Sequence, residues 1–232
     1  MEELEENSGR GLESMVDFSA LRTKMVDGQV RPNDVTDLRI IDAMGAVARE
    51  NFVPDDQKPL AYLDRDLPLA NGRSARVLIQ PMVLARLLQY ASIKPTDKAL
   101  EVGTASGYGA AVLARLAGSV VALEENSNLA AAARRQLAGL ANVAVVEASL
   151  VGGAPDAAPF DVILFNGAAA TFPNTIAGQL AKGGRLLLVE EGGSAPRAKL
   201  YTRDDGGVSG RALFNASVPV LPGFEAVETF AF

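Results

Sequence analysis

Apolar residues in the second half of the chain fall in short runs, and the segments between these runs have helical spacing. Each run is bounded by turn-forming residues, which is typical of buried strands. The predicted strands lie at residues 98–102, 119–123, 142–146, 160–165 and 184–190. The predicted helices lie at residues 107–117, 126–139 and 173–181. This alternation predicts βαβ units, and therefore a parallel sheet that is covered on both faces.

The segments on either side of this region follow other patterns. Residues 17–50 have helical spacing on both sides of a break at Pro32, and residues 55–78 are irregular and rich in turn formers. A further helix begins with Pro81 at its first position. Near the C-terminus, the stretches LYTRDD, RALFNASVPVL and AVETFAF alternate with turns. They predict antiparallel strands added to one edge of the sheet.

Composition excludes several classes of protein. The chain has 232 residues, a net charge of −6 and no basic run, which argues against a nucleic-acid carrier. It has no cysteine and no histidine, so disulfides, thiolate zinc sites, serine–histidine hydrolases and histidine-ligated metals are ruled out. A carboxylate Mg²⁺ site would need an acidic cluster, and none stands out, so we expect no metal.

The chain also lacks the usual signs of membrane insertion or export. It contains no run of about 18 consecutive apolar residues, which a membrane span requires. Its first residues, MEELEENSGRGLES, are acidic and lack the apolar core of a secretory signal. We therefore expect a cytoplasmic protein without membrane association, and a disordered leader over residues 1–15.

A glycine-rich loop follows the first predicted strand of the sheet, in the stretch ALEVGTASGYGAAVLA at 99–114. A dinucleotide fingerprint would need glycines at 103, 105 and 108, but 105 is alanine and 108 is tyrosine. A phosphate-binding P-loop would need a lysine, and the loop has none. The observed pattern is an acid, Glu101, followed by Gly103 and Gly107 at a strand-to-helix turn. These two glycines allow a sharp bend and a close approach of backbone to ligand.

A second acid lies at the end of the next predicted strand. Glu124 follows SVVAL, 21 residues after Gly103, where a carboxylate accepts both hydroxyls of a ribose in nucleotide-binding α/β folds. S-adenosylmethionine has a ribose and an adenine but no pyrophosphate, so it suits this loop better than a dinucleotide does. The alternative is a plain tight turn, with Glu124 capping the next helix.

With these features in place, the sequence resembles the protein-L-isoaspartate (D-aspartate) O-methyltransferases, a family of class I S-adenosylmethionine-dependent methyltransferases. The resemblance extends over about residues 18–232. Its most specific stretches are Arg-Glu-x-Phe-Val-Pro at 49–54 and Glu-Val-Gly-Thr-x-Ser-Gly-Tyr at 101–108. It implies an α/β fold with a doubly wound, mostly parallel, seven-stranded Rossmann-like sheet, an N-terminal helical extension and antiparallel C-terminal strands. After the leader, residues 16–95 would cover the substrate, and residues 96–232 would bind the cofactor.

The resemblance also implies an activity, a cofactor and a set of contacts. The family methylates the carboxyl group of isoaspartyl residues in damaged proteins, which starts their repair. The donor is S-adenosyl-L-methionine, and the partner is a damaged protein or peptide. The implied cofactor contacts are Glu101, Gly103, Thr104, Ser106, Gly107, Glu124 and Ser149.

Two departures from the family pattern affect these expectations. The family's Thr-Ile-Ser-Gln-Pro is Val77-Leu78-Ile79-Gln80-Pro81 here, so Ile79 stands in the place of the active-site serine and cannot hydrogen-bond a carboxylate. The family's Gly-Asp-Gly after the third strand is Glu-Ala-Ser here, at residues 147–149. Ser149 or Glu147 would therefore have to take the place of the aspartate.

Two polar residues are candidates for the chemistry that the missing serine would have served. Gln80 either replaces the serine's hydrogen bond or caps the helix that begins at Pro81. Asn166 either presents its amide at the mouth of the site or serves as a helix cap or turn residue. Because the serine is absent, two other functions remain open. One is a methyltransferase for an unknown small, more apolar acceptor, and the other is a degenerate homologue without catalysis. The sequence predicts no oligomeric state.

Overall fold

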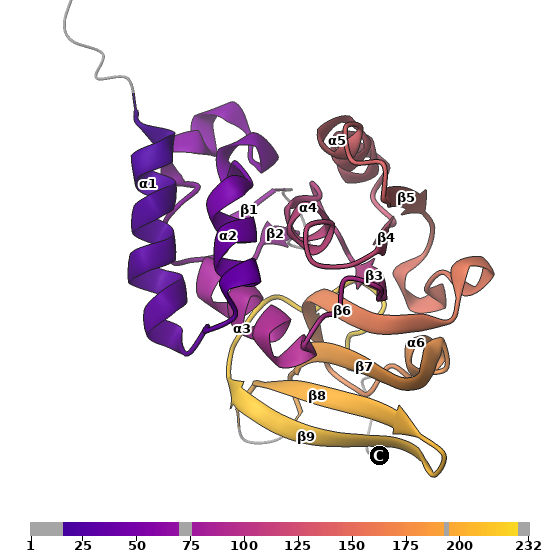
Figure 1. Cartoon of the computed structure of the whole chain (residues 1–232). Helices are drawn as coiled ribbons and strands as arrows, with labels where there is room; N and C mark the ends of the chain where they lie inside the picture. The colour runs from indigo at the N-terminus through magenta and orange to yellow at the C-terminus, as the bar shows by residue number, and fades with distance from the viewer. Residues whose placement is uncertain (1–15, 70–75, 193–194, 227–232) are drawn as a thin grey trace, which may run out of the picture.

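A single sheet forms the centre of the protein (Figure 1). The computed structural model describes residues 16–69, 76–192 and 195–226, and within these ranges the sheet has seven strands in the order β5-β4-β3-β6-β7-β8-β9. The pairs from β5 to β7 are parallel, and β8 and β9 are added antiparallel. This confirms the predicted sheet and its antiparallel edge. The strands are β3 (Lys98–Val102), β4 (Ser119–Glu124), β5 (Val143–Glu147), β6 (Phe160–Ala169), β7 (Leu180–Glu190), β8 (Arg197–Asp204) and β9 (Gly207–Asn215).

The direction in which strands are added reverses between β3 and β6. From β3 the chain proceeds outward to β4 and β5, and it then returns to place β6 on the other side of β3. In open α/β sheets, ligands bind at the carboxyl ends of the strands beside such a reversal. The loop of Gly103 follows β3, and Asn166 lies near the end of β6, so the fold places both at this point.

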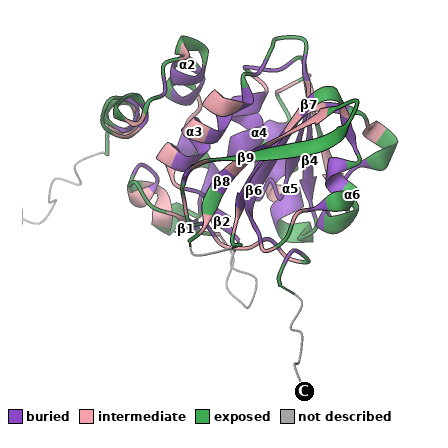
Figure 2. Ribbon diagram, turned by 90° about the horizontal axis from the view of Figure 1, so that it is seen from below, coloured by how far each residue is buried: buried purple, intermediate pink, exposed green. Residues whose placement is uncertain are grey.

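Both faces of the central sheet are buried. In β6, Val162 and Leu164 pack into one hydrophobic cluster, whereas Ile163 and Phe165 pack into a second cluster on the opposite face. Successive residues of a strand point to opposite faces, so a doubly covered strand is apolar throughout. Figure 2 shows the buried central strands and the exposed strand β9 at the edge.

The N-terminal extension is helical on both sides of Pro32, as predicted. Asp37 caps the second helix by accepting a hydrogen bond from the N–H of Arg39 at 2.9 Å, and Pro81 is the first residue of α3. The irregular stretch that follows contains a short antiparallel pair, β1 and β2. Among the described residues, no helix combines the length and apolar character needed to cross a bilayer. The elements are α1 (Phe18–Met25), η1 (Val26–Val30), η2 (Arg31–Asn33), α2 (Leu38–Ala46), η3 (Arg49–Phe52), η4 (Asp55–Leu60), β1 (Leu67–Pro68), β2 (Val77–Leu78) and α3 (Pro81–Ala91).

Two predicted helices are shorter than expected. The helix predicted at 107–117 is α4 (Tyr108–Leu113), because the next residues tighten into i→i+3 hydrogen bonds, such as Arg115 N–H to Val112 at 3.1 Å. The helix predicted at 173–181 is α6 (Asn174–Ala177), because Leu180 already pairs with β6 and begins β7. The remaining elements are α5 (Ser127–Leu137), η5 (Leu150–Gly152) and η6 (Pro155–Ala157).

The chain ends differ from the prediction in detail. The stretch RALFNASVPVL is a strand only to Asn215, after which Val220 returns to form a parallel bridge with Ala168 of β6. The third predicted edge strand, AVETFAF, lies mostly outside the described residues, as does the predicted leader at 1–15.

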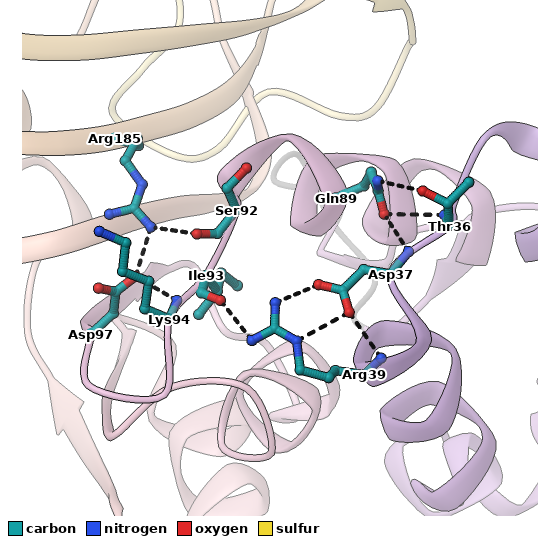
Figure 3. Close-up of polar contacts among 9 residues, drawn as sticks. All are labelled: Thr36, Asp37, Arg39, Gln89, Ser92, Ile93, Lys94, Asp97 and Arg185. Carbon is teal, nitrogen blue, oxygen red and sulfur yellow. Dashed lines mark hydrogen bonds and ion pairs between the residues drawn. The ribbon is translucent and has the colours of Figure 1, made fainter.

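A polar network joins the N-terminal extension to the sheet (Figure 3). Arg39 of α2 donates to the carbonyl of Ile93 at 3.0 Å, and Gln89 of α3 accepts from two backbone N–H groups just before α2. On the other side, Arg185 of β7 donates to the carboxylate of Asp97 at 2.6 Å. These contacts fix α2 and α3 against the sheet, which also fixes the segment that leads into α3.

Candidate functional site

The glycine loop between β3 and α4 is a strained turn tied to the next strand. Gly103 and Gly107 have φ angles of 76° and 99°, and Ala105 between them has 54°. Glycine adopts this left-handed region without steric cost, which explains the two glycines of the motif. The backbone N–H groups of Gly103 and Thr104 both donate to the carbonyl of Leu123 at 2.9 Å. The loop therefore lies directly against the end of β4.

The buried side chain of Glu101 contacts this loop. Its side chain has no exposed surface, and the hydroxyl of Thr104 donates to its Oε2. Gly109 leaves room for the carboxyl group, since a Cβ at that position would lie 1.8 Å from Oε1. Burial raises the pKa of Glu101 to about 8. The placement makes Glu101 a support of the loop, and its predicted direct contact with the cofactor stays a prediction.

Ser106 ties the loop to the N-terminal extension. Its hydroxyl donates to the carbonyl of Phe52 at 2.5 Å. Phe52 belongs to the Arg-Glu-x-Phe-Val-Pro stretch, so the two most specific motifs of the sequence are in direct contact. The hydroxyls of Ser106 and Thr104 are thus both engaged within the protein, and their contacts with a ligand stay predictions.

Glu124, at the end of β4, is held by four N–H donors among the described residues. Its Oε1 accepts from the backbone N–H groups of Glu125 at 3.1 Å and Asn126 at 3.0 Å. Its Oε2 accepts from the backbone N–H of Ala105 and from Nη2 of Arg76, both at 2.8 Å. The side chain of Glu124 has no exposed surface. The alternative role as a helix cap is wrong, because Asn126 caps α5.

A cavity of about 600 Å³ opens beside Glu124 at the carboxyl ends of β4 and β5. Its volume lies within the range of about 300–1,000 Å³ that is typical of small-molecule sites. Two of the predicted contacts, Glu124 and Ser149, meet here. The cavity is lined by Arg76, Glu124, Glu125, Asn126, Glu147, Ala148, Ser149 and Pro222.

The three candidate catalytic positions lie in different environments. Ile79 is 1% exposed within the hydrophobic core, and its carbonyl accepts from Arg49 at 2.7 Å. Gln80 precedes α3, and its backbone N–H donates to Asp66 at 2.8 Å, but its side chain makes no capping hydrogen bond with described residues. Gln80 is nevertheless the N-cap residue of α3, as the second alternative predicted, and its carbonyl accepts from the backbone N–H of Leu84 at 3.3 Å.

Asn166 lies within β6, so the alternative of a helix cap or turn residue is wrong for this residue. Its side chain is 3% exposed, and its Nδ2 has no hydrogen-bond partner among the described residues. Buried polar groups normally have a partner, so this amide has a hydrogen bond to give that the described residues do not take up.

The sequence did not reveal Arg76 as a site residue. Arg76 is 4% exposed, and its Nη2 donates to the carbonyl of Gly103 at 2.7 Å as well as to Glu124. It comes from the turn-rich stretch before β2, where no periodic pattern predicts the position of a side chain. Glu125, Asn126 and Pro222 also line the cavity and were not expected. For Glu125 and Asn126 the one signal in the sequence was their position directly after Glu124, the acid that is predicted to bind a ribose.

Comparison with known proteins decides the family. A family model described as protein-L-isoaspartate(D-aspartate) O-methyltransferase matches residues 21–220. The chain belongs to this family. A protein-L-isoaspartate O-methyltransferase of Koribacter versatilis is 42% identical over 173 residues, which are 74% of this chain and 77% of the relative. One of Methylorubrum extorquens is 40% identical over 177 residues, 76% of each chain.

Solved structures of protein-L-isoaspartate O-methyltransferases share the fold. One is 25% identical with a TM-score of 0.76, and the match covers 87% of this chain and 66% of that one. Another, from Plasmodium falciparum in complex with S-adenosyl-L-homocysteine, is 18% identical with a TM-score of 0.74 and covers 86% of this chain and 97% of that one. These matches confirm the predicted Rossmann-like methyltransferase fold.

S-adenosyl-L-methionine is the cofactor of the family, and the cavity suits its nucleoside part. Glu124 supplies a carboxylate of the kind that binds ribose hydroxyls. Glu147 and Ser149 also line the cavity and carry oxygen acceptors. Glu147 is exposed and pairs with Arg134 at 2.8 Å, while hydrogen bonds from Ser127 and Arg134 lower its pKa. The residues that line the cavity therefore fit a nucleoside. In this structure the carboxylate of Glu124 is hydrogen-bonded to the guanidinium of Arg76.

Proposed function

We propose that this chain transfers a methyl group from S-adenosyl-L-methionine to the carboxyl group of isoaspartyl residues in damaged proteins or peptides. The family match over residues 21–220 carries the proposal, and it is supported by relatives of about 40% identity that bear this name. The cavity beside Glu124 supports the donor. The comparisons give nothing in favour of a different acceptor or of a protein without catalysis. The cytoplasm remains the expected compartment.

The reaction demands little general acid–base chemistry from the protein. A carboxylate is already a nucleophile, which suits a chain without histidine or cysteine. S-adenosyl-L-methionine supplies an electrophilic methyl group on its sulfonium. The protein's task is therefore to bind the two substrates, to orient them and to exclude water. Orientation alone lowers the activation barrier by as much as about 7–11 kcal/mol in the best intramolecular reactions.

We assign these tasks to residues at the ends of β3, β4 and β6. Glu124 binds the ribose, and the loop from Gly103 to Gly107 brings backbone N–H and carbonyl groups against the ligand. Asn166 donates its unpaired amide to a ligand carboxylate. The side chain of Ile79 contributes no hydrogen bond, so the acceptor's carboxylate takes its donors from other groups, with Asn166 as the proposed one.

A transfer assay with matched peptides tests this function. The chain is incubated with S-adenosyl-L-methionine labelled in its methyl group and a peptide that contains one isoaspartyl residue. The control is the same sequence with an ordinary aspartyl residue. We expect label in the isoaspartyl peptide only. Equal labelling of both peptides, or of neither, would refute the proposed acceptor.

A further inference from the structure

We propose that Arg76 competes with the cofactor's ribose for Glu124: its guanidinium covers this carboxylate in the free protein and moves away when a nucleoside binds. This inference rests on the proposed function, because it takes Glu124 as the group that binds the ribose. It makes Arg76 a residue that sets the affinity for the methyl donor.

One nitrogen of the Arg76 guanidinium contacts one oxygen of the Glu124 carboxylate. This nitrogen, Nη2, bridges Glu124 at 2.8 Å and the carbonyl of Gly103 at 2.7 Å. Both side chains are buried, with 4% exposure for Arg76 and none for Glu124. A Cβ at Gly103 would lie 2.9 Å from the same Nη2, so glycine is needed there for the guanidinium to lie against the loop. The guanidinium of Arg76 thus lies directly against the carboxylate of Glu124, and both residues line the cavity.

The hydrogen-bonding capacity of Glu124 explains why Arg76 must leave. A carboxylate has about four lone-pair sites, and four N–H groups of the described residues donate to Glu124. Three of these donors are backbone N–H groups, one in the glycine loop and two in the residues just before α5, so releasing them would break local structure. Arg76 is the one side-chain donor of the four, and its departure frees one acceptor position for a ribose hydroxyl.

In this proposal the side chain of Arg76 moves and its backbone does not. The carbonyl of Arg76 accepts a hydrogen bond from the backbone N–H of Leu69 at 2.7 Å, which extends the pairing of β1 and β2 and holds the backbone of Arg76 in place. Its other guanidinium nitrogen, Nη1, is buried without a partner among the described residues, so the covered state leaves one donor unsatisfied. Binding that requires a minor state weakens the apparent affinity in proportion to the population of that state.

Calorimetric titration of an arginine variant tests the inference. Arg76→Met keeps much of the side-chain volume and removes every donor. A hydrogen bond to a charged group is worth about 1.5–3 kcal/mol, so we expect adenosine and S-adenosyl-L-homocysteine to bind at least about tenfold more tightly to Arg76→Met than to the unchanged protein. Arg76→Lys keeps the charge but not the guanidinium geometry, and we expect an intermediate gain.

Two controls separate competition for the carboxylate from other effects. We expect 2′,3′-dideoxyadenosine, which lacks both hydroxyls, to gain less than about twofold, because it does not need Glu124. Arg31→Met removes an exposed arginine that pairs with Asp27 on the N-terminal extension, and it should leave all affinities unchanged. Thermal unfolding of each variant confirms that it is folded, and the lysine variant replaces the methionine variant if the latter is not.

The possible outcomes distinguish this inference from the proposed function. If Arg76→Met binds adenosine more weakly, Arg76 contacts the ligand directly, and the competition is refuted while the cofactor assignment stands. If dideoxyadenosine gains as much as adenosine, Arg76 only fills space, and the competition is again refuted. If neither the unchanged protein nor any variant binds S-adenosyl-L-homocysteine, the proposed function itself fails.

Discussion

The guanidinium of Arg49 donates to the carbonyl of Ile79 at 2.7 Å from a side chain without exposed surface. The same group donates through Nε to the carbonyl of Ala61 at 2.7 Å and lies 4.7 Å from the ring centre of Tyr108. A buried cation from the Arg-Glu-x-Phe-Val-Pro stretch therefore fixes the segment before α3, which contains Ile79, against α4.

Replacing Arg49 should destabilise the protein. Arg49→Met leaves two buried carbonyl acceptors without their donor, and each unsatisfied group costs about 1–3 kcal/mol. We expect the free energy of unfolding, measured in urea, to fall by about 2–6 kcal/mol. The exposed control Arg31→Met should change it by less than about 1 kcal/mol. Equal effects of the two substitutions would contradict the role of Arg49 in fixing this segment.

Restoring serine at position 79 should not raise activity. Ile79 is 1% exposed and packs in the core, so a hydroxyl there is buried among apolar side chains and does not reach a peptide. We expect Ile79→Ser to lower stability by about 2–4 kcal/mol, with kcat/KM for an isoaspartyl peptide changed less than about threefold at temperatures where the variant is folded. Ile79→Ala is the matched control for lost volume. A tenfold gain with serine but not alanine would show that this position contacts the acceptor.

Glu101 should make stability depend on pH. Burial raises its pKa to about 8 in the folded state, whereas the unfolded chain keeps the ordinary value of 4.5, so between these values the folded state binds more protons. The contribution of Glu101 to stability is therefore full below about pH 4.5 and is lost as the pH rises to about 8, by about 1.4 kcal/mol for each unit between the two pKa values. Glu101→Gln should remove this dependence. Urea unfolding at pH 5, 6, 7 and 8 checks it, and parallel curves for both proteins would contradict the buried proton.

We expect Asn166 to contribute to methyl transfer but not to the stability of the fold. Its Nδ2 has no partner among the described residues, so Asn166→Ala removes an unsatisfied donor and should change the free energy of unfolding by less than about 1 kcal/mol. We expect methyl transfer to the isoaspartyl peptide to fall at least about tenfold. Loss of stability with unchanged transfer would assign Asn166 to the structure alone.

The sequence predicted the parts of the fold that local pattern determines. Apolar runs such as 160–165 identify buried strands because both faces of a parallel sheet are covered. Gly103 and Gly107 identified the loop because only glycine adopts its backbone angles readily. The end of the helix before β7 was not predictable, since Leu180 joins the sheet through a long-range pairing with Phe160. The contact between Arg76 and Glu124 was equally hidden, because it joins residues 48 apart in the chain.

The most direct test of the central claim is the mass of the product. The purified chain is incubated with S-adenosyl-L-methionine and an isoaspartyl peptide, and the peptide is then fragmented in a mass spectrometer. We predict that one methyl group replaces one proton, and that fragmentation places it on the isoaspartyl carboxyl group. An unmodified peptide in the presence of a protein that binds the cofactor, or a methyl group on any other residue, would contradict the claim.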